Sequence, residues 1–136
     1  MSRGYIRGRY AEERLVAKLS RLGWTACRIP MSGGAAQVDV EAIKPNDRRL
    51  ALIEVKSTSK NRVVVDCESV KRMKGRFECW YRHIIRSDWR VEFVLAVLWR
   101  VKSGRGFWVM KDIGCQLDGS TSILVRREDR DWSWTP

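Results

Sequence analysis

Two acids and a lysine stand at the ends of neighbouring apolar segments, where they could hold a divalent metal ion. Glu54 and Lys56 end the apolar run LALIEVK, and fourteen residues separate Asp39, in QVDVEAI, from Glu54. A buried carboxylate without compensation costs several kcal/mol. Mg²⁺ prefers carboxylate oxygens and keeps several waters, so that two or three converging acids suffice to hold it. The sequence therefore predicts that a divalent cation compensates Glu54.

The same three residues also allow plainer interpretations. Glu54 and Lys56 lie about 7 Å apart on one face of a strand and could form a simple ion pair. An isolated Asp39 would be an ordinary exposed acid of a half-buried strand, and we interpret Glu41 in that way. An ion pair alone does not explain why these charges end an apolar strand that follows an acid-bearing one.

A metal at this place would fit hydrolysis of a phosphodiester. The ion would lower the pKa of a bound water and neutralise charge that develops on the phosphate. Lys56 could orient that water, help to deprotonate it, or stabilise the charged phosphate. The spacing D…(D/E)-x-K is also the signature of metal-dependent nucleases, although the bare string often occurs by chance.

A third acid comes from a predicted helix over residues 6–22, which ends before Gly23. Its apolar stripe consists of Leu15, Val16, Leu19 and Leu22. With about 100° per residue, Glu12 falls within this stripe, whereas Glu13 and Arg14 point outward. Glu12 could instead lie in an exposed first turn and favour the helix dipole. The helical wheel leaves both interpretations open.

Periodicity in the rest of the chain predicts a sheet and a second helix. The strands are predicted at 24–30, 37–43, 49–57, 63–66, 91–101, 106–112 and 122–128, and the helix at 68–86. Residues 49–53 are apolar on both faces, which is typical of a strand covered on two sides. KSGR predicts a hairpin. The order indicates an α/β fold with a mixed central sheet flanked by helices, as a single domain over 1–127 and a C-terminal tail over 128–136.

Composition limits the classes of protein that fit. The 136 residues are 44% apolar and 32% charged, as in a globular domain. No apolar run approaches the ~20 residues of a membrane span, and no signal peptide is evident, so we expect an intracellular protein. The net charge of +11 predicts a polyanionic partner, and nucleic acid is preferred over a merely cationic surface.

The cysteines and the single histidine do not support zinc or triad chemistry. The four cysteines contain no C-x-x-C pair, and we expect them to be reduced and to fill the core. His83, the only histidine, is predicted on the surface of the second helix. Trp80, Trp99 and Trp108 are predicted in the core or a dimer interface, and either fate is open for Trp132 and Trp134.

The motifs together carry a family resemblance. GRYAEERLVAKLSRLGWTACRIPMSGGAAQVDVEA, followed by LALIEVKSTSK, resembles the archaeal-type Holliday junction resolvases, which also occur in viruses and phages. The resemblance covers roughly residues 4–66 and preserves the order of helix Glu, strand Arg, Ser/Gly loop, Asp, and E-V-K. It implies a restriction-endonuclease-like fold and a homodimer that cuts opposed strands of a four-way DNA junction in recombination and repair. It also implies Mg²⁺ as cofactor, with Mn²⁺ as a substitute.

The resemblance assigns residues to this activity. It implies a catalytic set of Glu12, Asp39, Glu54 and Lys56, in which the three carboxylates bind the metal. Arg28 matches the strand arginine near the phosphate, and Ser32 matches a loop serine of the same site. The family commonly has Arg directly after the helix Glu, whereas Glu13 follows here. The DNA contacts predicted around this site are Arg7, Arg9, Arg28, Ser32, Ser57, Lys60 and Arg62.

Other functions stay open beside this one. The chain could be another nuclease of the same fold that acts on duplex or branched DNA, or a non-catalytic basic DNA-binding module. RNA binding is disfavoured because no RNP-type aromatic motif is present. A two-fold dimer would supply the two equivalent sites that paired incisions need. The apolar late strands are our expected dimer surface.

Overall fold

The computed structural model describes residues 3–29, 38–81, 88–129 and 133–136. Its helices are α1 (Arg3–Arg21) and α2 (Cys67–Tyr81), and two short 3₁₀ turns are η1 (Pro45–Asp47) and η2 (Gly114–Gln116). Its strands are β1 (Thr25–Arg28), β2 (Val40–Lys44), β3 (Arg49–Thr58), β4 (Arg62–Val65), β5 (Arg90–Trp99), β6 (Phe107–Asp112) and β7 (Ile123–Arg126). The predicted order of helices and strands is confirmed.

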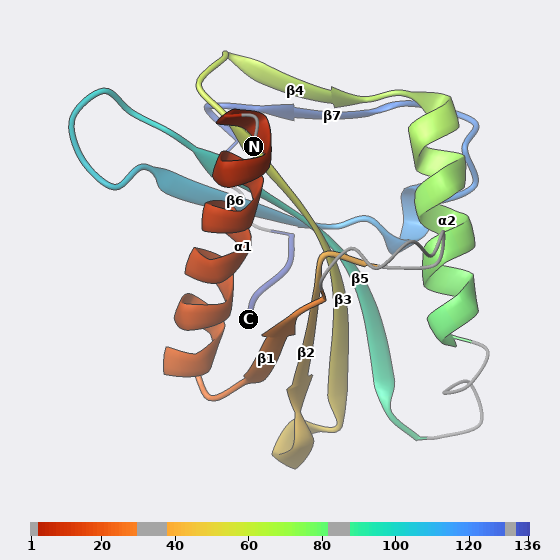
Figure 1. The fold of residues 1–136 in the computed structure, drawn as a ribbon. Coiled ribbons are helices and arrows are strands. Elements are labelled where there is room, and N and C mark those ends of the chain that lie inside the picture. Colours follow the sequence, from red (N-terminus) through yellow and green to blue (C-terminus); the bar gives the residue numbers. More distant parts are fainter. Residues whose placement is uncertain (1–2, 30–37, 82–87, 130–132) are drawn as a thin grey trace.

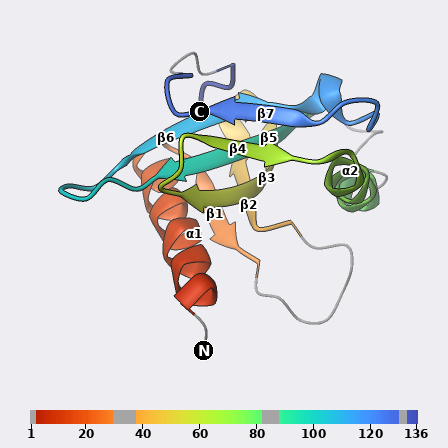
Figure 2. The ribbon, with the colours of Figure 1, turned by 90° about the horizontal axis from the view of Figure 1, so that it is seen from above.

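Five strands form a mixed central sheet in the order β1-β2-β3-β5-β6 (Figure 1). Only β3 and β5 pair in parallel, and they do so over the full ten residues of each strand. The remaining neighbours are antiparallel, including β5 and β6, which the predicted KSGR hairpin connects. β4 and β7 form a separate two-stranded sheet next to the start of α2, visible from above in Figure 2.

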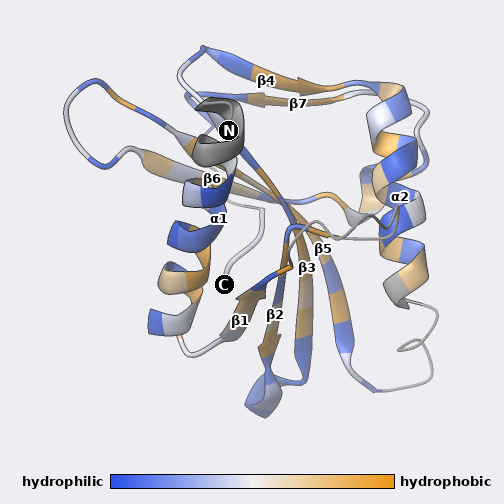
Figure 3. Cartoon of the chain, viewed as in Figure 1, coloured by the Kyte–Doolittle hydropathy of each residue, from blue (hydrophilic) through white to orange (hydrophobic). Residues whose placement is uncertain are grey.

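The two helices cover opposite faces of the central sheet. Side chains of β3 alternate between these two faces. Leu50 and Leu52 pack in the cluster that contains the apolar stripe of α2, whereas Ile53 packs in the cluster that contains the apolar stripe of α1. The hydrophobic colouring of β3 and β5 in Figure 3 reflects this double coverage. The apolar side chains of β5 and β6 are largely buried within the chain, so the expectation that they form a dimer surface is not supported.

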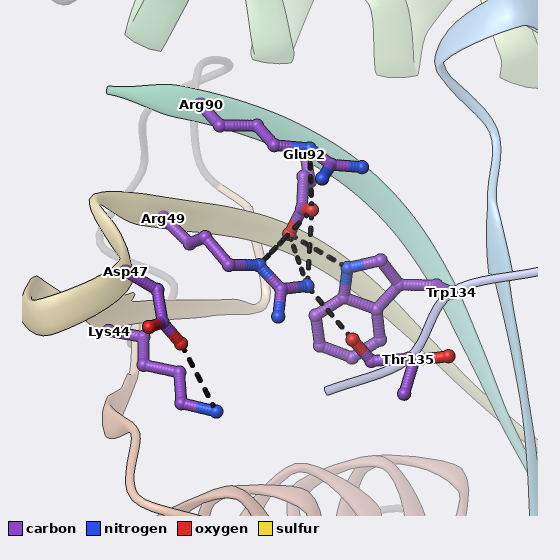
Figure 4. A network of polar contacts seen from close by, with 7 residues as sticks. All are labelled: Lys44, Asp47, Arg49, Arg90, Glu92, Trp134 and Thr135. Atoms are coloured by element: carbon purple, nitrogen blue, oxygen red, sulfur yellow. Dashed lines mark hydrogen bonds and ion pairs between the residues drawn. The ribbon is translucent and has the colours of Figure 1, made fainter. Parts of the chain in front are cut away.

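The C-terminal residues fold back onto the sheet. The Trp134 indole lies 5.6 Å from the Trp24 ring and donates a 2.9 Å hydrogen bond to buried Glu92. Arg49 donates to the same carboxylate and to the Thr135 carbonyl, both at 2.9 Å (Figure 4). Trp134 is therefore a core residue. The domain limit at residue 127 stays a prediction.

The structure tests the predictions made for the tryptophans, the histidine and the cysteines. Trp99 and Trp108 are core residues as expected, whereas the Trp80 side chain, Trp132 and His83 lie outside the described part. The cysteines are free, but the expectation that they fill the core is wrong: Cys27, Cys79 and Cys115 are exposed. The core consists instead of larger residues such as Leu52 and Phe77, whose side chains bury more apolar surface. No helix in the described ranges is long and apolar enough to cross a membrane.

Candidate active site

Glu54 lies on the central strand β3, on the face that α2 covers. It follows Leu50 and Leu52 at a spacing of two, and its side chain is 8% exposed. Two cations compensate it: the Arg76 guanidinium lies 3.3 Å from Oε1, and the Lys56 ammonium lies 4.0 Å from the same oxygen. The predicted Glu54–Lys56 proximity is confirmed, and an arginine of α2 adds to it.

Asp39 lies immediately before β2, where the edge of β3 is open. Val40 pairs with Ile53, so the next position along β3 has no β2 residue opposite it. Asp39 uses this gap: its Oδ2 accepts a 2.8 Å hydrogen bond from the Val55 amide, and its carbonyl accepts one from Ile29. The expectation that Asp39 is part of the strand is therefore wrong by one residue. Its position next to Glu54 follows from this register.

Glu12 approaches from the opposite face, on α1. It lies in the middle of this helix, which excludes the interpretation as an exposed first-turn acid. Its side chain is 16% exposed, whereas that of Glu13 is 54% exposed, as the helical wheel predicts for these positions. Arg28 of β1 donates a 2.6 Å charge-assisted hydrogen bond to Glu12 Oε2. This pair fixes Glu12 at the edge of the sheet near Asp39.

Asp39 is the electrostatic neighbour that the two glutamates share. Burial, followed by the negative charge of Asp39, raises the pKa of Glu54 to about 7, although Lys56 and Arg76 oppose the shift. Burial also raises the pKa of Glu12, against the lowering effect of Arg28, and Asp39 adds to the rise. Burial is thus the main reason that both glutamates resist ionisation, and the charge of Asp39 adds to it.

The donor set fits a hard divalent cation. Asp39 and Glu54 are adjacent across the edge of β3 and supply the carboxylate oxygens that Mg²⁺ prefers. A cation between them would favour the charged form of Glu54, whose pKa is raised by burial and then by the charge of Asp39. Within the described ranges, no three acids, cysteines or histidines form a ready metal cluster. Asp39 and Glu54 are thus the pair best placed as ligands, with Glu12 next to Asp39.

Arg76 is a residue of this site that sequence reasoning did not assign. It lies on α2 at the flank of the apolar stripe formed by Val70, Met73 and Phe77. Both of its contacts to Glu54, at 3.3 and 3.4 Å, use one terminal nitrogen. A helical wheel of α2 would show a cation directed partly toward the sheet. It would not show that Glu54 is the partner, because that contact joins residues 22 positions apart.

The predicted DNA contacts have different environments. Lys60 and Arg62 are exposed, and Arg9 is exposed while it pairs with Glu13. The hydroxyl of Ser57 is buried and has no hydrogen-bond partner in the described part of the chain, so it is not placed to contact DNA. Strand alternation explains this, since Ser57 and Lys56 point to opposite faces. Ser32 and the Arg7 side chain lie outside the described residues.

Comparisons with known proteins agree with this geometry. The family description "Archaeal holliday junction resolvase (hjc)" matches residues 3–78, more than half of the chain. The chain belongs to the archaeal Holliday junction resolvase family. Members of this family are junction-resolving nucleases of DNA recombination and repair, and this chain is one of them. All four predicted catalytic residues fall within the matched region, whereas β5, β6 and β7 lie beyond it.

A solved structure shows the same fold. The chain is similar to Hjc from Archaeoglobus fulgidus, a Holliday junction resolvase from an archaeal hyperthermophile. The TM-score is 0.60 at 19% identity, and the match covers 89% of this chain and 84% of that one. A search of curated proteins found no match. The restriction-endonuclease-like architecture expected of a resolvase is confirmed as a mixed sheet between two helices.

The raised pKa of Glu54 predicts that the metal-free protein is less stable at high pH. The folded-state pKa of about 7 lies above the ordinary 4.5, so the penalty for the charged form is full above the folded value and disappears below the ordinary one. Glu54→Gln should therefore melt at a higher temperature than the wild type near pH 8.5 with a chelator present, and the difference should shrink through the range between the two pKa values and vanish below the ordinary one, at about pH 3.5. Melting curves at both pH values measure this. Glu78→Gln on the surface of α2 is the control, and an equal gain there would contradict the prediction.

Proposed function

We propose that this chain, acting as a homodimer, resolves four-way DNA junctions by metal-dependent hydrolysis of one phosphodiester in each of two opposed strands. The observation that carries the proposal is the buried Glu54 next to Asp39, with Lys56 on the same strand face and a Glu54 pKa that burial and the Asp39 charge raise to about 7. A protein that only binds DNA gains nothing from burying acids where phosphates approach. The net charge of +11 supports a polyanionic substrate.

The residues divide the chemistry between them. Asp39 and Glu54 would hold Mg²⁺, with Mn²⁺ as a substitute, and Glu12 is the third predicted carboxylate beside Asp39. When bound, the ion supplies Lewis-acid polarisation of the phosphate and a lower pKa for water. Lys56 is 46% exposed, so its ammonium reaches solvent while it stays 4.0 Å from Glu54. From there it can orient the attacking water or stabilise negative charge on the phosphate.

Two arginines position the carboxylates. Arg76 binds Glu54 from α2 and limits the positions that this carboxylate can take. Arg28 holds Glu12 from β1 and also carries a charge that a nearby phosphate would feel. Exposed cations, among them Arg9, Lys60 and Arg62, would contact the DNA backbone. Such contacts place the DNA without reading its sequence, as expected for a protein that recognises the shape of a junction.

A comparison of DNA substrates tests the proposal. With Mg²⁺ present, a labelled four-way junction should be cut in two symmetry-related strands, whereas linear duplex, Y-shaped and nicked DNA of the same sequence should stay largely intact. A chelator should stop the reaction. Equal cutting of plain duplex would show another nuclease of this fold, and binding without cutting would show a non-catalytic module. Either result would contradict the proposal.

A further inference from the structure

A basic pocket lies at the end of the central sheet where β3 and β5 finish. Its volume is about 560 Å³, and its lining comes from three separate segments of the chain. Ser59 follows β3, Arg127 follows β7, and a run of three residues follows β5. The lining residues are Ser59, Arg100, Val101, Lys102 and Arg127. The pocket is thus lined by the turn between β3 and β4, the base of the β5–β6 hairpin and the residue after β7.

Backbone hydrogen bonds fix the walls of this pocket. The Arg100 amide donates to the Thr58 carbonyl at 2.8 Å, and the Arg127 amide donates to the Asn61 carbonyl at 2.9 Å. The Trp99 indole donates to the Lys60 carbonyl at 2.6 Å and ties β5 to the same turn. The backbone at Arg100 and Arg127 is therefore anchored directly after the ends of β5 and β7, which gives the pocket fixed walls.

The hairpin base is closed by a glycine. Gly106 has φ +73°, and a β-carbon there would collide with the Trp99 carbonyl. A larger residue would push the two strands apart and open the wall that carries Arg100 and Lys102. On the other side, Arg14 of α1 donates to the Arg105 carbonyl, which connects the hairpin to the helix that bears Glu12.

The pocket is positively charged and has no counter-charge of its own. Three of its five lining residues are cations, and none is acidic. Throughout the described ranges, the side chains of Arg100, Lys102 and Arg127 form neither an ion pair nor a hydrogen bond, unlike Arg28, Arg49 and Arg76. The Nε of Arg100 is buried without an acceptor, which is costly for a charged group. An anion in the pocket would offset the charge of the Arg100 guanidinium.

We propose that this pocket seats a backbone phosphate of the DNA substrate at a distance from the cut site. Arginine forks match phosphate oxygens in a bidentate way, and the Ser59 hydroxyl adds a donor. Lys102, Arg127 and Ser59 are exposed, so a long polyanion can reach them. Ser59 follows Lys56 by three residues, or roughly 10 Å of extended chain. DNA whose scissile phosphate lies at Lys56 therefore brings further phosphates into reach of the pocket.

The inference deepens the proposed function and rests on it for the identity of the substrate. Arg100, Lys102 and Arg127 lie beyond the region that the family description matches, so these contacts would be a feature of this chain's second half. This pocket, which we call the phosphate seat, would hold one arm of the junction at a fixed position relative to the active site. It would raise the affinity for DNA and make that affinity depend more steeply on salt concentration, because each neutralised phosphate releases counterions.

Junction binding tests the phosphate seat. The double variant Lys102→Ala/Arg127→Ala is titrated with a labelled four-way junction in the presence of a chelator, at several salt concentrations, by fluorescence anisotropy. We expect about tenfold weaker binding at moderate salt. The slope of log K against log salt should become shallower by about 1, because one phosphate contact is lost. A linear duplex of equal length is measured alongside.

Two further proteins make the result decisive. Arg21→Ala removes an exposed cation at the C-terminal end of α1, far along the helix from the hairpin, and should bind like the wild type. Lys102→Arg/Arg127→Lys keeps both charges and should restore affinity and slope. Melting curves confirm that each variant is folded. If the alanine variant shows the same affinity and slope as Arg21→Ala, the phosphate seat is overturned.

Together with the cleavage assay of the wild type, this titration separates the two proposals. If the wild type does not cut junctions but the alanine variant still loses affinity and slope on duplex DNA, the resolvase proposal fails and the phosphate seat stands. If the wild type cuts junctions and the variant binds unchanged, the seat fails and the resolvase proposal stands.

Discussion

Asp39→Asn and Glu54→Gln are each expected to slow junction cleavage by roughly a thousandfold or more, because a bound ion contributes several kcal/mol of transition-state stabilisation. Each amide keeps the shape of the side chain but removes its charge, and its NH₂ group cannot ligate a cation. Junction binding should persist or become tighter in both variants, because a negative charge is removed from a surface that phosphates approach. Single-turnover cleavage and anisotropy measure the two properties separately.

Glu41→Gln is a matched control for this prediction. Glu41 lies two residues after Asp39, on β2, and is half-buried, and its burial raises the pKa of the carboxyl as it does for Glu54. Glu41 differs from Asp39 in position, because it lies opposite Leu52 of β3 and not beside Glu54. The Glu41 variant should cut at the wild-type rate. A rate within tenfold of the wild type in either Asp39→Asn or Glu54→Gln would contradict the assigned roles.

Local patterns in the sequence predicted the elements that carry the site. The order of helices and strands along the chain, the coverage of β3 on both faces and the KSGR hairpin follow from periodicity and turn residues. The inward direction of Glu12 followed from its place on the apolar stripe of α1. These predictions hold because they depend on burial of whole elements, which side-chain spacing alone determines.

Contacts between distant segments were not predictable in the same way. Asp39 leaves the strand because its carboxylate satisfies the Val55 amide, a bond that depends on where β2 begins. Arg76 meets Glu54, and Trp134 meets Glu92, only after α2 and the C-terminal residues have packed. Such partners are chosen by three-dimensional packing, and the sequence pattern around each residue does not indicate which of several opposite charges or acceptors it meets.

The buried position of the Ser57 hydroxyl could have been predicted from strand alternation in the sequence. The loop motif KSTSKNR favoured it as a phosphate contact, but alternation along β3 places it opposite to Lys56. Lys60, in the turn after β3, and Arg62, the first residue of β4, are both exposed. Within a strand, a basic, hydroxyl-rich run therefore indicates DNA contacts only at alternate positions.

A divalent cation between Asp39 and Glu54 should be detectable directly, without DNA cleavage. In the metal-free protein, burial and then the charge of Asp39 raise the pKa of Glu54 to about 7, and a cation between the two carboxylates would favour the charged form. Mn²⁺ is suitable because it prefers the same oxygen ligands and is followed by electron paramagnetic resonance. The ion should bind at one site per chain and be displaced by Mg²⁺.

The decisive measurement is the Mn²⁺ titration of the wild type, Asp39→Asn, Glu54→Gln and the control Glu41→Gln under identical conditions. We predict that the wild type and Glu41→Gln bind one ion per chain with the same affinity, while the Asp39 and Glu54 variants bind it about tenfold more weakly or lose it. Equal Mn²⁺ binding by all four proteins, or no site in the wild type, would contradict a carboxylate metal centre at the end of β3.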